Sequence, residues 1–437
     1  MDKLKEAFYI RSLELRNEMR ATLKAHGTRK VDEVHLSQVF GGMRGVKSMI
    51  WETSQLDPVE GIRFRGHSIP DLKEKLPKRA GDKEPLPEGL FWLMLLGEIP
   101  TQEEVDWLSD EWERRRNIPP HTYQVLDSLP IDTHPMTQFN IAISCLQSNS
   151  TFVQRYAEGM SKNDYWDPTY EDAMNLIACL PRIAAYIYRR SYFNGEHIEP
   201  NDSLDWAGNF AHMLGVSDNE DFKSFMRLYM TIHADHEGGN ASAHTVHLVG
   251  STLSDAYQSF AAGMNALAGP LHGLANQEVI KWIFEMIEAL GTSQPSDEQI
   301  RKYIQETLDA GKVIPGYGHA VLRRPDPRFM AQKRFSEEYI DSDPTIKIVW
   351  KLFEIVPPIL QGLGKVKNPW PNVDAHSGAV LVYYGLTQYK YYTVLFGVSR
   401  ALGVLASLCW SRALGMPLER PKSVTYEWVK DFLDSAG

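Results

Sequence analysis

Residues 368–378, with the sequence Asn-Pro-Trp-Pro-Asn-Val-Asp-Ala-His-Ser-Gly, restrict the fold more than any other stretch of this chain. Pro369 and Pro371 flank Trp370. Proline fixes its own φ and keeps the preceding residue out of the helical region, so the backbone here is extended and stiff. The stretch is therefore typical of a rigid connection that ends where a helix begins.

Two long apolar runs with few charges follow this loop, 379–386 and 394–410. Ser377 and the smaller Gly378 suit the start of a helix. We therefore expect the loop to present the Asp374 carboxylate and the His376 imidazole at the mouth of a buried helix. The alternative is that Asp374 only caps that helix, as an isolated Asp before an apolar run often does.

Helical periodicity recurs through most of the chain. Residues 2–26 carry apolar side chains roughly in one stripe, which predicts a helix that lies on another surface. Only the glycine-punctuated stretch 41–66 favours a small hairpin. The Ala-, Gly- and Ser-rich stretch 242–268 predicts one helix, cut by the break at 269–273. The pattern as a whole predicts an all-α fold.

The chain has 437 residues, which is long for one compact core. Helical patterns after the break at 269–273 lead back to the stiff loop. We therefore expect a large domain made of residues 1–272 and 380–437, with a smaller domain, 273–379, inserted between its two parts.

Composition excludes several classes of partner and compartment. The formal net charge is −10 and there is no basic block, which argues against nucleic acids and anionic membrane surfaces. Cys145, Cys179 and Cys409 stand far apart among apolar neighbours, a pattern of reduced thiols rather than disulfides. No apolar run is expected to span a bilayer. The N-terminus resembles neither a signal peptide nor a transit peptide, so we expect that any targeting sequence was removed or never present.

Three loops share one design, in which glycine and proline break a helix and a histidine or aspartate follows. They present His272 in 269–273, His319 in 315–319 and Asp374 in 371–374. One such residue could be a helix cap, but three together suggest an acid–base constellation held by stiff turns.

Arginines accompany these loops. Arg323, Arg324 and Arg328 follow His319 closely, and Arg400 lies inside an apolar run. A buried arginine is costly unless it is paired, so a carboxylate ligand is a natural partner for Arg400. An Asp or Glu from elsewhere in the fold is the alternative.

A histidine-rich stretch invites comparison with metal sites. Its possible ligands are His233, Asp235, His236, Glu237, His244 and His247. Their spacing fits no standard zinc pattern, and no His-Glu-x-x-His helix is present. We therefore expect no metal.

Several long motifs, in this order, resemble the eukaryotic mitochondrial citrate synthase family. They are IHADHEGGNASAH (232–244), LAGPLHGLANQE (267–278), PGYGHAVLR (315–323), the loop 368–378, YYTVLFGVSRALG (391–403) and LERPKS (418–423). The likeness runs from about Gly41 to Ser423.

The resemblance implies an all-α homodimer in the mitochondrial matrix that condenses acetyl-CoA with oxaloacetate to citrate and CoA. It implies no permanently bound cofactor, with the coenzyme A thioester as a substrate. It implies a catalytic trio of His272, His319 and Asp374. It implies that oxaloacetate is held by His236, Arg328, Arg400 and, from the other subunit, Arg420. It implies CoA contacts at Arg44, Lys162, Val313, Gly316, Arg323, Lys365, Lys367 and Asn372, with Lys162 standing where the family has an arginine.

The chemistry requires more than one group. An acetyl methyl group is a very weak acid, so Asp374 needs a hydrogen-bond donor at the thioester oxygen, which the resemblance assigns to a neutral His272. His319 and Arg328 would polarise the oxaloacetate carbonyl. The alternative is 2-methylcitrate synthase, which uses propionyl-CoA, because one methylene contributes only a few kcal/mol. A metal-dependent hydrolase and a non-catalytic helical scaffold are alternatives from other classes.

Overall fold

The computed structural model describes residues 2–340, 342–364 and 366–435, and most of them are helical. The helices up to residue 267 are α1 (Lys3–His26), α2 (Leu36–Phe40), α3 (Ile69–Lys75), α4 (Pro87–Leu96), α5 (Gln102–Arg115), α6 (Pro120–Ser128), α7 (Pro135–Leu146), α8 (Thr151–Ala157), α9 (Trp166–Tyr192), α10 (Trp206–Leu214), α11 (Glu220–Ile232), α12 (Ala241–Ser251) and α13 (Ala256–Leu267). The later ones are α14 (Ala275–Leu290), α15 (Asp297–Asp309), α16 (Pro327–Tyr339), α17 (Pro344–Gly362), α18 (Asp374–Tyr383), α19 (Tyr392–Leu414) and α20 (Tyr426–Ser435). Short 3₁₀ turns are η1 (Gln147–Asn149), η2 (Lys162–Asp164) and η3 (Tyr389–Tyr391). The predicted all-α fold is confirmed.

One small sheet accompanies the helices. Strands β1 (Ser54–Asp57), β2 (Gly61–Phe64) and β3 (His67–Ser68) are antiparallel in the order β1-β2-β3. Ser54 lies opposite Phe64, and Arg63 lies opposite Ser68. The hairpin predicted within 41–66 is confirmed, although its first strand begins only at residue 54.

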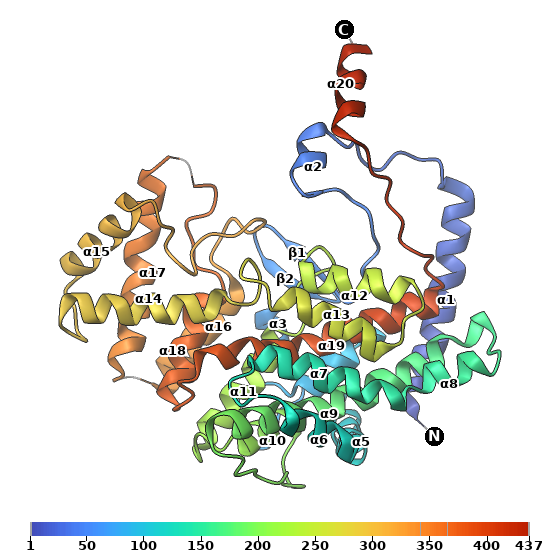
Figure 1. Cartoon of the computed structure of the whole chain (residues 1–437), viewed down its shortest axis with the longest axis horizontal. Coiled ribbons are helices and arrows are strands. Elements are labelled where there is room, and N and C mark those ends of the chain that lie inside the picture. The colour runs from blue at the N-terminus through green and yellow to red at the C-terminus, as the bar shows by residue number, and fades with distance from the viewer. Residues whose placement is uncertain (1, 341, 365, 436–437) are drawn as a thin grey trace.

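Helix α19 forms the centre of the molecule, and α9 packs along it (Figure 1). Almost every side chain of α19 is buried. Residues 389–414 are long and apolar enough to cross a bilayer by length and composition, yet the apolar part is wholly buried inside the protein. The expectation that no run would pass this test is therefore wrong. The run satisfies it because a core helix surrounded by other helices is apolar on every side.

The stretch 242–268 is two helices and not one. Helix α12 ends at Ser251, and Leu253 then adopts a left-handed conformation with φ 69°. The Asp255 side chain accepts a hydrogen bond from the Gln258 backbone N–H, 3.0 Å away, and so caps α13. The break contains neither glycine nor proline, which explains why the composition of the stretch did not predict it.

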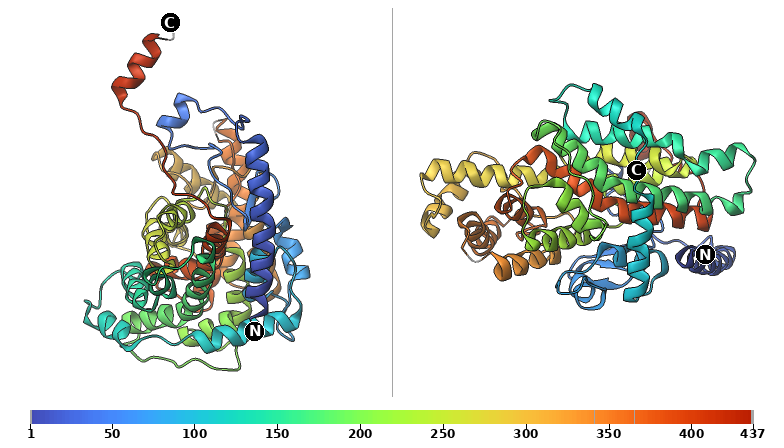
Figure 2. Two further views of the ribbon diagram at one scale, coloured as in Figure 1. Left: turned by 90° about the vertical axis from the view of Figure 1, so that its right-hand side faces the viewer. Right: turned by 90° about the horizontal axis from the view of Figure 1, so that it is seen from below.

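Helices α14 to α18 lie together at one end of the molecule (Figures 1 and 2). They pack chiefly on one another, with α14, α16 and α17 against α18 and α15 against α17. Contacts to the rest of the chain include those of α16 with α3 and α11. This group of helices coincides with most of the predicted insertion, 273–379.

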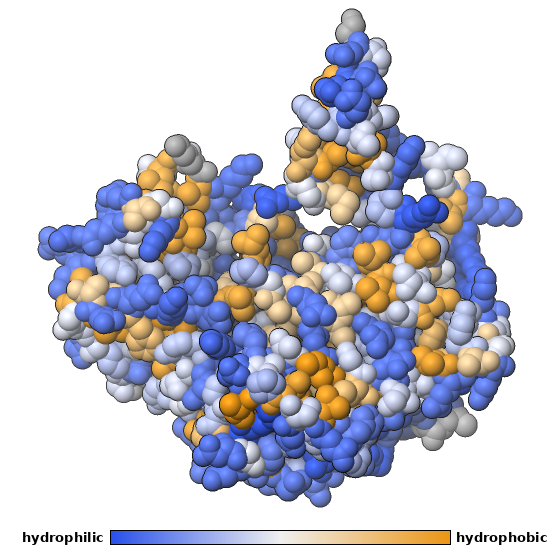
Figure 3. Space-filling model, in the orientation of Figure 1, coloured by the Kyte–Doolittle hydropathy of each residue, from blue (hydrophilic) through white to orange (hydrophobic). Residues whose placement is uncertain are grey.

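Two segments project from the body, residues 27–50 with α2 and the tail after α19 with α20 (Figures 1 and 2). They meet where the rings of Phe40 and Tyr426 lie 6.4 Å apart between centroids. Apolar side chains gather at the lower part of this projection (Figure 3). The exposed apolar residues of the two segments are Val31, Val34, Val39, Phe40, Met43, Ile50, Leu418, Val424, Tyr426, Trp428, Phe432 and Leu433.

Candidate functional site

Six of the side chains singled out by the sequence converge in one region. They are His236 after α11, His272 between α13 and α14, His319 before α16, Arg328 in α16, Asp374 at the start of α18 and Arg400 within α19. Burial holds the pKa of His236 well below its usual range, and the nearby groups Arg328, His319, Arg400 and His272 lower it further. The rings of His236 and His319 lie 5.4 Å apart between centroids. Asp374 lies near both arginines, whose charges partly oppose the rise in its pKa that burial causes.

His272 is a neutral imidazole with a defined tautomer. Its Nε2 accepts a hydrogen bond from the Ser242 backbone N–H at 3.2 Å, and the Ser242 hydroxyl lies 2.9 Å from the same nitrogen. A ring nitrogen that accepts from a backbone N–H carries no proton, so the proton of the neutral ring is on Nδ1. Burial, and then the charge of Arg400, lowers the pKa of His272 to about 4. Nδ1–H is therefore a donor at neutral pH.

His319 has the opposite tautomer for the same reason. Its Nδ1 accepts from the backbone N–H groups of Val321 at 3.0 Å and Leu322 at 3.1 Å. The proton of the neutral ring is therefore on Nε2. Burial, and then the charge of Arg328, lowers the pKa of His319 to about 4.

Asp374 is the first residue of α18 and does not cap it. Val373 occupies the capping position, and no hydrogen bond from the described part of the chain reaches the Asp374 carboxylate. Burial raises the pKa of Asp374 to about 6, against the lowering effect of Arg328. The capping alternative is therefore wrong, because the carboxylate is left without a partner among those residues, as a general base requires.

The two arginines differ in their partners. Arg328 is paired with Asp326, with Nη2 at 2.7 Å and Nε at 3.1 Å from the two carboxylate oxygens. Arg400 donates to the His233 carbonyl oxygen at 3.1 Å and to Asn240 Oδ1 at 3.0 Å. It forms no ion pair with any residue that the structure describes, and burial lowers its pKa to about 10. This arrangement favours a carboxylate ligand over an ion pair within the protein.

Comparison with known proteins decides the family. The family model described as "Citrate synthase, C-terminal domain" matches residues 42–422. The chain is 57% identical to the mitochondrial citrate synthase of Daucus carota over 94% of this chain and 86% of that one. It is also 57% identical to that of Xiphias gladius, over 92% of this chain and 85% of that one.

This chain belongs to the citrate synthase family. Solved structures agree with this assignment. The citrate synthase of Pyrobaculum aerophilum superimposes with a TM-score of 0.77 at 28% identity, covering 91% of this chain and 95% of that one. The citrate synthase of Thermotoga maritima superimposes with a TM-score of 0.71 at 25% identity, covering 88% of this chain and 95% of that one. The family model and these relatives thus confirm the resemblance carried by the sequence motifs.

Two loops to which the citrate synthase resemblance assigns CoA contacts are joined by backbone hydrogen bonds. The Gly318 N–H donates to the Trp370 carbonyl oxygen at 3.0 Å, and the Asn372 N–H donates to the Gly316 carbonyl oxygen at 2.9 Å. Gly316 has a positive φ of 78°, and a Cβ there would lie 2.9 Å from Ala375. The loops form one rigid surface beside Asp374, which is two residues from Asn372.

Other residues of this CoA set are exposed. Val313 and Lys367 are exposed, and Arg323 is exposed with its guanidinium bound to carbonyl oxygens of its own loop. Lys365 lies outside the described residues. Arg44 and Lys162 are exposed on the projecting segment and on η2, and the structure records no bond from either side chain to these loops. Neither is brought to the site within one chain.

Arg420 is likewise not part of the site within one chain. It is exposed in the tail after α19. The carboxylate of the neighbouring Glu419 contacts two histidines of α12. Its Oε1 lies 2.8 Å from His244 Nε2, and its Oε2 lies 3.8 Å from His247 Nε2. This contact holds the tail against α12 before it leaves the body.

The histidine-rich stretch is dispersed. His233 stacks on Tyr229 with ring centroids 4.0 Å apart, His236 faces the site, and His244 and His247 face Glu419. No group of three metal-ligating side chains occurs among the described residues. The described residues therefore offer no site for the metal ion that the alternative function, a metal-dependent hydrolase, would need.

His376 is not at the mouth of the helix, as the sequence had suggested. It is fully buried, with Nε2 3.0 Å from the Ser336 hydroxyl and its ring 5.4 Å from that of Phe329. Helix α18 begins three residues earlier than expected, and its 100° rotation per residue turns His376 away from Asp374. His376 is a core residue of the α14–α18 group.

The sequence also missed site residues whose roles depend on contacts made elsewhere in the chain. Asn240 and Ser242 bind Arg400 and His272, and Asp326 pairs with Arg328. Only Asp326 had a local signal, because Asp followed by Pro327 is typical of a helix start.

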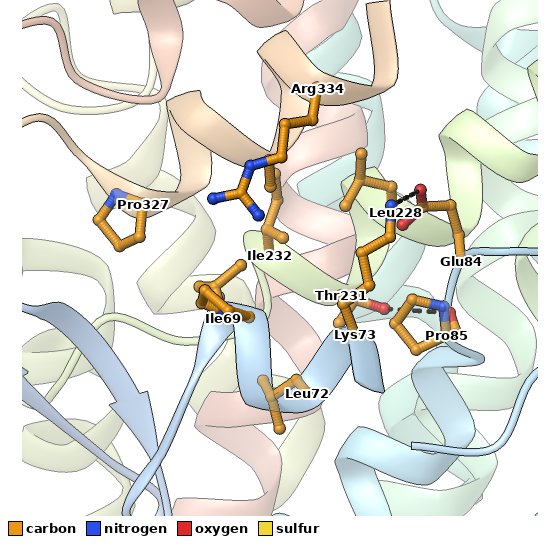
Figure 4. Close-up of a pocket in the computed structure, with 12 residues that line it drawn as sticks. Ile69, Leu72, Lys73, Glu84, Pro85, Leu228, Thr231, Ile232, Pro327 and Arg334 are labelled. Atoms are coloured by element: carbon orange, nitrogen blue, oxygen red, sulfur yellow. Dashed lines mark hydrogen bonds and ion pairs between the residues drawn. The ribbon is translucent and has the colours of Figure 1, made fainter. Parts of the chain in front are cut away.

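A small cavity lies between α3, α11 and α16 (Figure 4). Its volume is about 20 Å³, and its walls include Leu72, Ile232 and Pro327. A space of this size admits one water molecule and not a dicarboxylate. It marks the junction between α16 and the rest of the chain and is separate from the site.

Proposed function

We propose that this chain condenses acetyl-CoA with oxaloacetate and hydrolyses the citryl thioester to citrate and CoA. The observation that carries this proposal is that one region holds the Asp374 carboxylate, which has no partner among the described residues, and two neutral imidazoles of fixed tautomer, His272 and His319. The first deprotonates and the other two donate, which is the set of groups that enolisation followed by carbonyl attack requires. Membership of the citrate synthase family supports it independently.

Asp374 and His272 act on the thioester. Asp374 takes a proton from the acetyl methyl group while the Nδ1–H of His272 donates to the thioester oxygen, where charge develops. A neutral donor with its pKa lowered to about 4 keeps its proton at pH 7 and is not replaced by an imidazolium. The raised pKa of Asp374 makes it a stronger base than a solvated aspartate.

Oxaloacetate is held by His236, Arg328 and Arg400. The arginines bind its carboxylates by charge-assisted hydrogen bonds, and the Nε2–H of His319 and Arg328 polarise its ketone oxygen. The enol carbon then attacks the ketone carbon, and water hydrolyses the resulting citryl thioester.

The CoA portion lies along the joined loops 313–318 and 365–372. Val313, Gly316 and Asn372 supply its surface, and the exposed cations Arg323 and Lys367 face its phosphates. The resemblance assigns Lys365, which lies outside the described residues, to the same phosphates. Arg44 also belongs to the CoA site by the resemblance, and the partner subunit contributes the contact that falls at Lys162. Lysine at 162 keeps a positive charge but lacks the fork of arginine, so this contact is weaker.

The protein is a homodimer in which Arg420 reaches the site of the other subunit. The projecting segments support this, since they expose many apolar side chains that a partner would cover. The Arg420 side chain forms no hydrogen bond or ion pair with any described residue of its own chain, and Glu419 fixes the tail next to it. The compartment is the mitochondrial matrix, and the mitochondrial citrate synthases named above support a mitochondrial location.

The two-domain division extends this proposal. Residues 273–379 form the smaller domain, which carries His319, Arg328 and Asp374. The larger domain, 1–272 and 380–437, carries His236 and Arg400. A dicarboxylate held from both sides draws the domains together and excludes water before the enol forms.

The direct test is thiol release from acetyl-CoA with and without oxaloacetate. Release should require oxaloacetate, and citrate should accumulate in equal amount. The same assay with propionyl-CoA separates this activity from that of 2-methylcitrate synthase, which would give the higher kcat/KM with the propionyl substrate. Release that does not depend on oxaloacetate would rule out the condensation.

Subunit complementation tests the role of Arg420. Asp374→Asn and Arg420→Ala are each expected to be inactive, but a mixed dimer puts both lesions into one site and leaves the other intact. Unfolding and refolding the two together should restore activity, whereas refolding either one alone should not. If subunit exchange is demonstrated and no activity returns, Arg420 does not act across the dimer.

A further inference from the structure

Asp235 is a fully buried carboxylate beside the site, and four hydrogen bonds surround it. Its Oδ2 accepts from Trp51 Nε1 at 2.9 Å, Thr53 Oγ1 at 2.6 Å and Ser54 Oγ at 2.8 Å. Its Oδ1 accepts from the backbone N–H of His236 at 2.9 Å. Every one of these contacts donates to the carboxylate, as suits an acceptor-only, negatively charged group.

The three side-chain donors come from one short segment, residues 51–54, which joins the projecting segment to β1. The same segment binds the next turn, because the Glu237 N–H donates to Ser54 Oγ at 2.9 Å and Leu56 N–H donates to Glu237 Oε2 at 3.2 Å. Glu237 holds a left-handed conformation with φ 55°, which is costly outside glycine and needs such support. The turn that carries His236 is thus fixed through Asp235.

Asp235 also lies against α19. The Gly403 N–H donates to the Ala234 carbonyl oxygen at 3.1 Å, and a Cβ on Gly403 would lie 2.4 Å from the Cβ of Asp235. One turn earlier on this helix is Arg400, whose guanidinium is fully buried without an ion pair in the described chain. Burial lowers the pKa of Arg400, and the negative charge of Asp235 is the largest effect that raises it again.

We propose that Asp235 is a positioning residue for the oxaloacetate site, which orients His236 and balances the charge of Arg400 without touching substrate. It does so by tying the turn 234–237 to residues 51–54. This inference rests on the proposed function, since it names how the dicarboxylate ligands of that site are held. Residues 51–54 thereby support the site, although they are far from His236 and Arg400 in the sequence.

The geometry distinguishes this role from ordinary core stability. Asp172 in α9 offers a matched comparison, because it is equally buried and accepts from Ser150 Oγ at 2.6 Å and from the backbone N–H groups of Thr151 and Phe152 at 2.7 and 3.2 Å. It lies away from the site, between α8 and α9. Loss of either carboxylate should cost stability, but only Asp235 should affect oxaloacetate.

The test is steady-state kinetics of the full-length enzyme with Asp235→Asn and Asp172→Asn. A displaced ligand group can cost about 10- to 100-fold, so the KM for oxaloacetate should rise by at least about tenfold in Asp235→Asn. The KM for acetyl-CoA should stay within about twofold, since its contacts lie on other loops. Asp172→Asn should leave both KM values unchanged. Calorimetric titration with oxaloacetate alone should show the same loss of affinity.

The two KM values distinguish a positioning role of Asp235 from a structural one. Equal changes in both KM values, or the same rise in Asp172→Asn, would overturn the positioning role in favour of a structural one. If Asp235→Asn does not fold, Thr53→Val removes one donor at nearly constant volume and should raise the oxaloacetate KM in the same selective way. An unchanged KM in that variant would overturn the inference. Failure of the wild-type enzyme to release thiol would instead refute the proposed function, independently of any variant.

Discussion

Replacing Asp374 by Asn should stabilise the protein at the same time as it abolishes turnover. The carboxylate is buried and accepts no hydrogen bond from a described residue, so its negative charge destabilises the folded state. Asn has almost the same shape and no charge. The structural cost of a catalytic base should therefore be visible as a gain in stability when the base is removed.

The magnitude follows from the pKa of Asp374, which is raised from 3.8 to about 6, chiefly by burial. One pKa unit corresponds to about 1.4 kcal/mol, so ionisation costs the folded state about 3 kcal/mol. Below pH 3.8 the acid is protonated in both states and the cost is absent. It develops between pH 3.8 and pH 6 and is complete above that range. With 437 residues, about 3 kcal/mol corresponds to roughly 3 °C in Tm.

The assay is thermal unfolding of both proteins at several pH values between 5 and 8. Asp374→Asn should melt higher than wild type at pH 7.5, and the difference should shrink toward pH 5. Asp172→Asn is the control, because the pKa of Asp172 is also raised to about 6 by burial. The amide keeps only one acceptor oxygen, so this variant loses one or two of the three hydrogen bonds that the carboxylate accepts and should gain nothing. A variant of Asp374 that melts at or below wild type at pH 7.5 refutes the reasoning, and near-normal turnover refutes its role as base.

Three further results are expected. Arg227 is buried between Asp82 and Asp205, so Arg227→Met removes the ion pair of Asp82 and leaves Asp205 with only the longer contact to Arg79, at 3.5 Å. This should cost about 3–5 kcal/mol in chemical denaturation, and an unchanged midpoint would contradict it. Gly403→Ala places a methyl 2.4 Å from the Ala234 carbonyl oxygen and should raise the KM for oxaloacetate or prevent folding, whereas Gly362→Ala meets no atom within 4 Å and should be neutral. Small-angle scattering should show a smaller radius of gyration with oxaloacetate bound; an unchanged radius with saturated binding would count against closure.

The breaks between helices could be predicted from the sequence because glycine and proline act locally. The loops that present His272, His319 and Asp374 are where the sequence places them. Which way a residue faces could not be predicted in the same manner. Asp374 and His376 are two positions apart, and about 200° of helix rotation sends one to the site and the other into the core.

Partners that are distant in sequence could not be predicted either. Nothing near Asp235 indicates that Trp51, Thr53 and Ser54 will surround it, because these donors are more than 180 positions away. The same holds for Arg400, whose neighbours Asn240 and His233 come from another turn. Hydroxyl, indole and amide donors are common throughout any sequence, so composition and periodicity do not predict which of them will form these hydrogen bonds.

The imidazoles of His272 and His319, to which we assign the donor roles, have a last consequence, which concerns pH. Their tautomers are set by backbone N–H groups, and every residue except proline provides one, so no side-chain motif could reveal them. Both rings have their pKa lowered to about 4 and stay neutral above pH 5. Asp374, with a pKa of about 6, is then the group that titrates on the acid side of neutrality. The kcat/KM for acetyl-CoA should fall below pH 6 as one proton binds, with a slope of one in a logarithmic plot between pH 6 and pH 5. A slope above one in this range would show that a histidine shares the titration, and a limb centred near pH 5 or below would show that the pKa of Asp374 is not raised to about 6.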